Sequence, residues 1–207
     1  MSDACCGDTA ARLASQRRVL WSVLVINAIA FVGEFAAGWW AGSLAVQADS
    51  LDNLGDGLVY AVSLFVLRRS ERDRAWAAGL KGLIQLLFGL GVLGEAAHKL
   101  ISGLPAAPLA PVMAIAAGGA LIANVACFVL LLRHRGTDLN MRSVWLCSRN
   151  DVIGNAGTLI VAGIVAATGY RWPDIAFGVA MALLFLHTSW QVLREAMRLL
   201  RSTETAR

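Results

Sequence analysis

Six long apolar stretches are the feature that most limits how this chain can fold. The hydrocarbon core of a bilayer is about 30 Å thick, and a helix needs roughly 20 apolar residues to cross it. The six stretches that meet this length lie at residues 19–41, 44–67, 76–101, 108–132, 141–168 and 172–199. They predict an all-α polytopic membrane protein with six transmembrane helices.

The composition and the loop lengths favour the same fold class. Of the 207 residues, 57% are hydrophobic and only 15% are charged, whereas about a quarter of the residues in a soluble domain carry charge. The connections are too short for a folded domain outside the membrane. We therefore expect an N-terminal tail at 1–18, a membrane domain at 19–199 and a disordered C-terminal tail at 200–207.

The net charge of +4 is distributed unevenly along the chain. Arginines gather at one set of stretch ends: Arg12, Arg17, Arg18, Arg68, Arg69, Arg72, Arg74, Arg133, Arg135, Arg194, Arg198 and Arg201. The opposite ends carry only Lys99 and Arg171. By the positive-inside rule, both termini are predicted to be cytoplasmic. No basic stripe is left over for nucleic acid.

The second stretch carries three acidic residues. Asp49, Asp52 and Asp56 stand at i, i+3 and i+7, which puts all three on one stripe of a helix. A charged residue near the bilayer centre costs roughly 2.5 to 3.5 kcal/mol on insertion scales, so three cost on the order of 8 to 10 kcal/mol. A bound cation or protons would offset this cost. The structural alternative is helix capping or pairing with Arg149 and Lys81.

The fifth stretch repeats the arrangement with a different donor. Cys147 and Asp151 are four residues apart, so a helix brings them to one face, one turn apart. A lone cysteine in a membrane helix is ordinarily a small apolar filler, and we interpret Cys127 in that way. Cys147 differs because an aspartate follows it by one turn. Gly154 and Gly157 would let a neighbouring helix approach closely.

The remaining polar groups inside the stretches are interpreted mainly as ion pairs. We expect Arg149 to pair with Asp49 or Glu34, which would neutralise these charges in place. A proton relay is the alternative for these groups and for Lys81 and Glu95.

The second stretch resembles the second helix of the cation diffusion facilitator family. It carries Gly-Ser-Leu-Ala at 42–45, Ala-Asp at 48–49, and then Asp52 with Asp56 four residues later. In that family a His or Asp in this helix is followed by Asp after three residues.

The fifth and sixth stretches extend the resemblance to roughly residues 15 to 200. Asn140, Arg142, Asp151 and the glycines beyond it are similar to the family's His-x-x-x-Asp helix, with Cys147 where histidine is usual. Residues 173–195 resemble the family's last helix.

The resemblance implies a homodimer of six-helix protomers in the cell (inner) membrane. Each protomer would exchange a cytoplasmic divalent metal ion for protons at a tetrahedral site between its second and fifth helices. The implied ligands are Asp52, Asp56, Cys147 and Asp151. The family commonly ends in a cytoplasmic domain, and we expect a short member without one.

The donor set agrees with the resemblance. Three oxygens and one sulfur suit four-coordinate zinc, and the soft thiolate makes cadmium or cobalt plausible substrates as well. The metal would be transported, and no prosthetic group is expected. Possible accessory ligands are Asp49, Asn150, Cys5 and Cys6. We interpret the two adjacent cysteines of the tail as inert rather than as metal-acquiring.

Two other functions fit the intramembrane acids. An intramembrane enzyme could use them as an aspartyl pair or as ligands of a catalytic metal, but the sequence has neither His-Glu-x-x-His nor Gly-x-Ser-x-Gly. A proton-coupled exporter of small molecules could use them as proton carriers, in which case Cys147 would be incidental.

Overall fold

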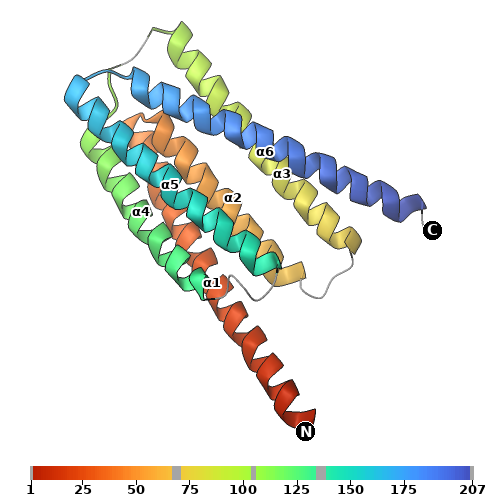
Figure 1. Cartoon of the computed structure of the whole chain (residues 1–207). Helices are drawn as coiled ribbons and strands as arrows, with labels where there is room; N and C mark the ends of the chain where they lie inside the picture. Colours follow the sequence, from red (N-terminus) through yellow and green to blue (C-terminus); the bar gives the residue numbers. More distant parts are fainter. Residues whose placement is uncertain (1, 67–70, 104–105, 134–138, 206–207) are drawn as a thin grey trace.

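The described part of the chain folds into six helices, α1 to α6 (Figure 1). The computed structural model describes residues 2–66, 71–103, 106–133 and 139–205, with most of their side chains. The side chains of Cys5, Cys6, Lys81 and Cys147 are outside the described part. The helices span Ser2–Ala41 (α1), Leu44–Val66 (α2), Glu71–Ile101 (α3), Ala110–Leu132 (α4), Leu139–Thr168 (α5) and Trp172–Thr205 (α6). The all-α membrane fold is therefore confirmed.

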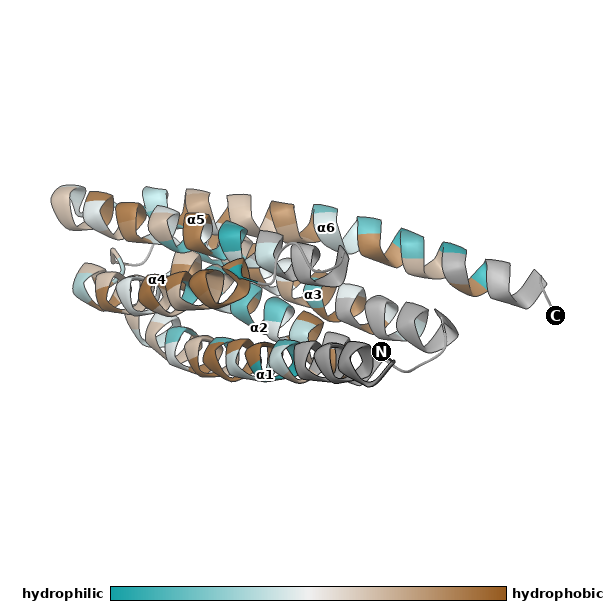
Figure 2. Ribbon diagram, turned by 60° about the horizontal axis from the view of Figure 1, so that its bottom comes forward, coloured by the Kyte–Doolittle hydropathy of each residue, from teal (hydrophilic) through white to brown (hydrophobic). Residues whose placement is uncertain are grey.

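Among the residues that the structure describes, five helices are long and apolar enough to cross a bilayer. These spans are Ala14–Ala41, Gly82–Ile101, Ala110–Leu132, Ser148–Thr168 and Trp172–Arg198. The 23-residue α2 is long enough too, but it carries the three aspartates. Figure 2 shows apolar residues along much of the bundle, with hydrophilic positions near the middle of α2 and α5.

The helices form two groups, and α2 belongs to the larger group and contacts both helices of the smaller one. Helices α1, α2, α4 and α5 lie side by side, and α3 pairs with α6 along its length (Figure 1). Helix α2 packs against each of the other five helices. The carboxylates of α2 are thus carried by the most central helix, which separates them from lipid.

Helices α1 and α6 extend furthest beyond the predicted stretches. Helix α1 begins at Ser2, so the segment predicted as an N-terminal tail is helical from residue 2. Helix α6 reaches Thr205, so the expectation of disorder is wrong for residues 200–205. That segment contains neither glycine nor proline to end the helix.

The connection between α1 and α2 is a tight turn with α6 packed against it. Gly42 adopts a φ of 66°, and the Ser43 hydroxyl accepts from Val46 N at 3.1 Å. The buried carboxylate of Asp174, in the first turn of α6, accepts from Ser43 Oγ at 2.5 Å, Leu44 N at 2.9 Å and Ala45 N at 3.0 Å. Asp174 therefore caps α2 from another helix, where the N-terminal N–H groups of α2 need acceptors.

Two cations stabilise the same turn. Arg171 Nη1 donates to the Gly42 carbonyl at 3.2 Å, and Lys99 Nζ donates to it at 3.3 Å. The Arg171 guanidinium also donates to the Ala106 carbonyl. The ends of α3 and α6 that lie near this turn are thereby tied to the α1–α2 connection.

Small residues let α6 approach α2 at this end of the bundle. A Cβ added at Gly178 would lie 2.8 Å from Leu44 Cγ and 3.0 Å from the Leu44 carbonyl carbon. At Gly163, on α5, no atom lies within 4 Å of an added Cβ.

These two glycines make a matched pair of stability tests. Gly178→Ala should destabilise the fold by about 1 to 3 kcal/mol, the usual cost of overpacking, because the Leu44 backbone must shift. Gly163→Ala should leave the stability unchanged or slightly raised, since alanine is the better helix former. Thermal unfolding of the purified proteins in detergent measures both effects. Equal melting temperatures for the two variants would contradict the close contact between α2 and α6.

Candidate metal site

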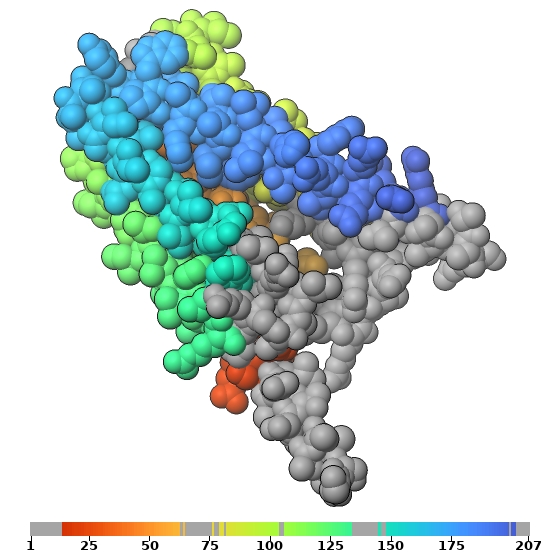
Figure 3. All heavy atoms as spheres, in the orientation of Figure 1, coloured from red at the N-terminus to blue at the C-terminus, as the bar shows by residue number. Residues whose placement is uncertain are grey.

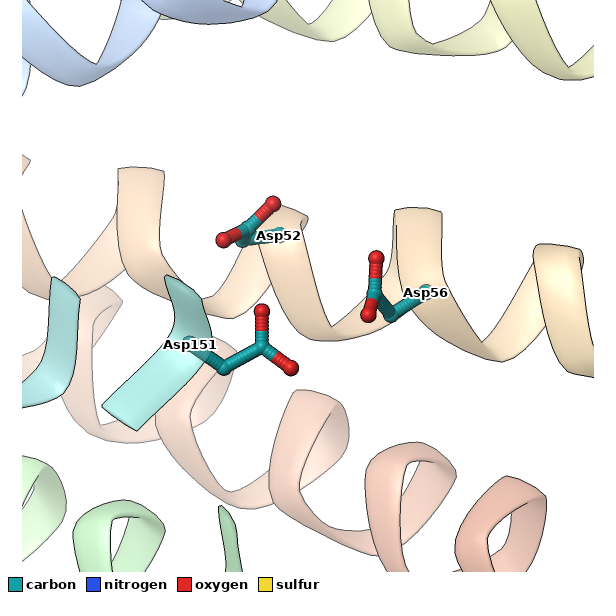
Figure 4. Close-up of side chains that lie close together, drawn as sticks. All are labelled: Asp52, Asp56 and Asp151. Carbon is teal, nitrogen blue, oxygen red and sulfur yellow. The ribbon is translucent and has the colours of Figure 1, made fainter. Parts of the chain in front are cut away.

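Three predicted ligands converge between α2 and α5. Asp52 and Asp56 lie one turn apart on α2, and Asp151 faces them from α5 (Figure 4). One carboxylate oxygen from each residue lies within 4.8 Å of the others. Asp151 is 3% exposed and Asp56 is 6% exposed, whereas Asp52 is half-buried. Their role as metal ligands stays a prediction.

The close packing of α5 on α6 and α2 explains how Asp151 reaches the α2 carboxylates. An added Cβ at Gly157 would lie 2.7 Å from the ring of Phe177, and one at Gly154 would lie 3.5 Å from Asp49 Oδ1. Larger side chains at these positions would displace α5. The small residues noted in the sequence therefore serve the approach of the two helices that carry the site.

The hydrogen bonds of the cluster leave part of it open to a cation. The Tyr60 hydroxyl, one turn beyond Asp56 on α2, donates to Asp56 Oδ2 at 3.0 Å. Asp151 Oδ2 is buried and has no hydrogen-bond partner among the described residues. A buried carboxylate oxygen without a donor is costly unless a proton or a metal ion approaches it. Tyr60 was missed from the sequence, although its i+4 spacing from Asp56 could have indicated it.

Asp49 lies outside this cluster, although it shares the stripe on α2. It is fully buried, and its Oδ1 accepts from Asn155 Nδ2 at 3.3 Å. The same Asn155 group donates to the Asp151 backbone carbonyl at 2.9 Å. Asp49 thus joins α2 to α5 beside the cluster, so its contacts favour a structural role.

A second polar chain links α2 to α1 and α4. Asn53 Nδ2 donates to Glu34 Oε2 at 2.5 Å, and Asn124 Nδ2 donates to Asn53 Oδ1 at 3.2 Å. All three side chains are buried. Asn53 directly follows Asp52, so these bonds set the rotation of α2 at the cluster. A lone asparagine in the apolar stretch of α4 was the signal for Asn124.

The predicted pairing of Arg149 with Asp49 or Glu34 is wrong. Arg149 is exposed, and its guanidinium donates to Asn150 Oδ1 at 3.5 Å. It stands two residues before Asp151, and positions that close along a helix point in different directions. Within the described ranges, Glu95 and Lys99 form an ion pair at 2.6 Å, so the ion-pair interpretation holds there.

The remaining candidates have different outcomes. Cys147 is on α5, one turn before Asp151, but its side chain is outside the described residues, as are those of Cys5 and Cys6. Asn150 is exposed. Cys127 is buried with Leu20, Val23 and Leu131, as expected for a filler. Its sulfur also accepts from Asn27 Nδ2 at 3.8 Å.

Residues 20–201 match the family profile described as the cation efflux transmembrane domain. The chain belongs to the cation efflux family. The resemblance to cation diffusion facilitators is thereby confirmed, and the chain is a multi-pass membrane protein.

The curated relatives of the chain are metal transporters by name. Zinc transporter ZitB of Yersinia pestis is 28% identical over 197 residues, which cover 88% of this chain and 62% of the relative. The cadmium, cobalt and zinc/H(+)-K(+) antiporter of Bacillus velezensis is 26% identical, with 86% and 62% covered. Metal cation efflux system protein CzcD of Cupriavidus metallidurans is 27% identical, with 88% and 61% covered. The chain thus spans about three fifths of the length of these relatives.

The geometry predicts which acids bind metal. Asp56→Asn and Asp151→Asn should each weaken zinc and cadmium binding by about tenfold or more, because each replaces a buried carboxylate ligand by a neutral amide. Glu95→Gln, which changes an acid outside the cluster, should bind as the unmodified protein does. Equilibrium binding of radioactive zinc or cadmium to protein in detergent measures the difference. Unchanged affinity in both aspartate variants would exclude the cluster as the metal site.

Proposed function

We propose that this chain forms the membrane domain of a divalent metal cation exporter of the zinc, cadmium and cobalt class. The observation that carries the proposal is the cluster of Asp52, Asp56 and Asp151, whose oxygens lie within 4.8 Å of one another between two membrane helices. Such a cluster is expensive in a bilayer unless cations occupy it, and intramembrane acids typically mark ion pathways. The names of the relatives support the same class of substrate.

Exchange for protons follows from the chemistry of the donors. Carboxylate and thiolate groups must lose their protons to bind metal, so metal and protons compete for the same atoms. The carboxylate oxygens of Asp52, Asp56 and Asp151 lie within 4.8 Å of one another, so bound protons would relieve the repulsion between them when no metal is bound. The metal-free site is therefore suited to hold protons that the incoming metal displaces.

Alternating access would arise from movement between the two helix groups. Helix α6 makes most of its contacts with α3 and fewer with α5, and atoms of α2 are visible between α5 and α6 on the face shown in Figure 3. Rocking of α3 and α6 against α1, α2, α4 and α5 would expose the cluster to one side of the membrane and then to the other.

Cys147 completes the proposed ligand set and gives it selectivity. Its backbone position on α5 is one turn before Asp151, so a helix presents both side chains to one neighbour. One thiolate among three carboxylates favours zinc, cadmium and cobalt over magnesium, calcium and manganese, which prefer shells of oxygen alone.

The arrangement of the protein in the cell is also a proposal. The distribution of arginines favours cytoplasmic termini, and in Figure 1 the two termini lie at the same end of the bundle. We place the chain in the cell (inner) membrane as a homodimer, as the family resemblance implies.

Transport assays with ligand variants test the proposed function. Asp56→Ala and Asp151→Ala should abolish zinc uptake into proteoliposomes under an imposed pH gradient, because each removes a charged ligand. Asp49→Asn should retain most of the activity, since Asp49 lies outside the cluster. Uptake is followed with a metal-sensitive dye trapped inside the vesicles. Wild-type uptake by either alanine variant would rule out this transport site.

The role of Cys147 is tested by metal preference. Cys147→His supplies a nitrogen ligand, so zinc transport should survive while the ratio of cadmium to zinc transport falls. Cys147→Ala removes the ligand, so both metals should be transported more slowly, with cadmium the more affected. Both rates are measured in the same vesicle preparation. If neither rate changes in either variant, Cys147 only fills space, and the three-carboxylate cluster alone binds the metal.

A further inference from the structure

A large apolar groove lies between α1 and α4, away from the carboxylate cluster. Its volume is about 850 Å³, within the range of roughly 300 to 1,000 Å³ typical of small-molecule sites. Small residues line it on both helices: Ala30, Gly33, Ala37, Ala116, Gly119 and Ala120. It runs beside α1 from Ile26 to Trp40, which is about 21 Å at 1.5 Å per residue. A long aliphatic chain fits these dimensions.

One acidic residue lines this groove. Glu34 is 3% exposed, and the other lining side chains are apolar. One of its oxygens accepts from Asn53, whereas Oε1 is buried and has no hydrogen-bond partner among the described residues. A carboxylate in an apolar groove attracts a hydrogen-bond donor of positive charge, because pairing offsets the desolvation of both groups.

The groove also has a route for such a donor from the membrane surface. Trp40, next to the end of α1, lines the groove and is 77% exposed. Aromatic rings at this depth lie at the headgroup level, and their faces attract ammonium groups. Glu34 lies six residues before Trp40 in α1, which is about 9 Å along the helix axis.

We propose that this groove binds long-chain alkylamines, with the ammonium group on Glu34 and the chain between α1 and α4. Glu34 is hydrogen bonded to Asn53, the residue after Asp52 on α2. An amine bound to Glu34 therefore acts on the helix that carries two acids of the carboxylate cluster. If the proposed metal export holds, the bound amine lowers the rate of transport.

Photolabelling of the full chain in nanodiscs of zwitterionic lipid tests the binding without any transport assay. The probe is a long-chain alkylamine that carries a diazirine, and the labelled peptides are identified by mass spectrometry. We expect labels within residues 26–40 and 112–123, removed by excess dodecylamine and not by dodecanol. Equal competition by the amine and the alcohol would show an acyl-chain groove only. Absence of label from α1 and α4, as when a second copy covers this face, would also overturn the proposal.

Variants separate the charge from the shape of the groove. Glu34→Gln can still accept from Asn53, but it should weaken competition by dodecylamine by about tenfold or more through loss of the charged partner. Gly119→Leu should abolish the labelling, since an added Cβ meets no atom within 4 Å and the longer side chain fills the groove. Glu95→Gln, an acid outside the groove, should label normally. Unchanged labelling of both Glu34→Gln and Gly119→Leu would place the amine elsewhere.

Effects on metal transport are read separately. Dodecylamine should slow zinc uptake by the unmodified protein and have a smaller effect on Glu34→Gln. Competed labelling without any zinc uptake would leave the amine site intact and refute the transport function. Zinc uptake without competed labelling would leave the transport function intact and refute the amine site.

Discussion

The cost of holding carboxylates inside a bilayer is the constraint on which the rest of this structure depends. Each of the three aspartates of α2 would cost roughly 2.5 to 3.5 kcal/mol near the centre of a lipid-facing helix. The bundle responds by surrounding α2 with the other helices and by giving its acids polar partners. The helix that carries most of these acids is thereby the one that contacts every other helix of the described structure.

The acids of α2 and their neighbours divide into two kinds by their hydrogen bonds. Asp49 and Glu34 take amide donors from Asn155 and Asn53, which tie α2 to α5 and to α1. The acids at 52, 56 and 151 meet one another instead, and like charges in contact are unfavourable without a counterion. Asp56 also accepts from the Tyr60 hydroxyl, but the three acids of the cluster face one another, and we propose that a cation binds between them.

Much of this could be predicted from the sequence, because spacing along a helix fixes which residues share a face. The i, i+4 spacing was enough to place Asp52 and Asp56 on one face, whereas the meeting of these two acids with Asp151 was implied only by the family resemblance. Contacts between helices were harder, since they depend on how each helix is rotated about its axis. Arg149 was assigned to buried acids for its charge alone, but α5 directs it outward. Asn124 was overlooked for the same reason.

The capping of α2 by Asp174 has a mechanical consequence. Helix α6 is bonded to the α1–α2 turn at one end through Asp174 and Arg171, and α3 is bonded to the same turn through Lys99. Their far ends diverge from α5 (Figure 1). Because α3 and α6 are held at one end, a small rotation at the turn produces a large displacement at their far ends. The half of the bundle that holds both termini should therefore open readily, whereas opening of the half with the capped turn requires these hydrogen bonds to break.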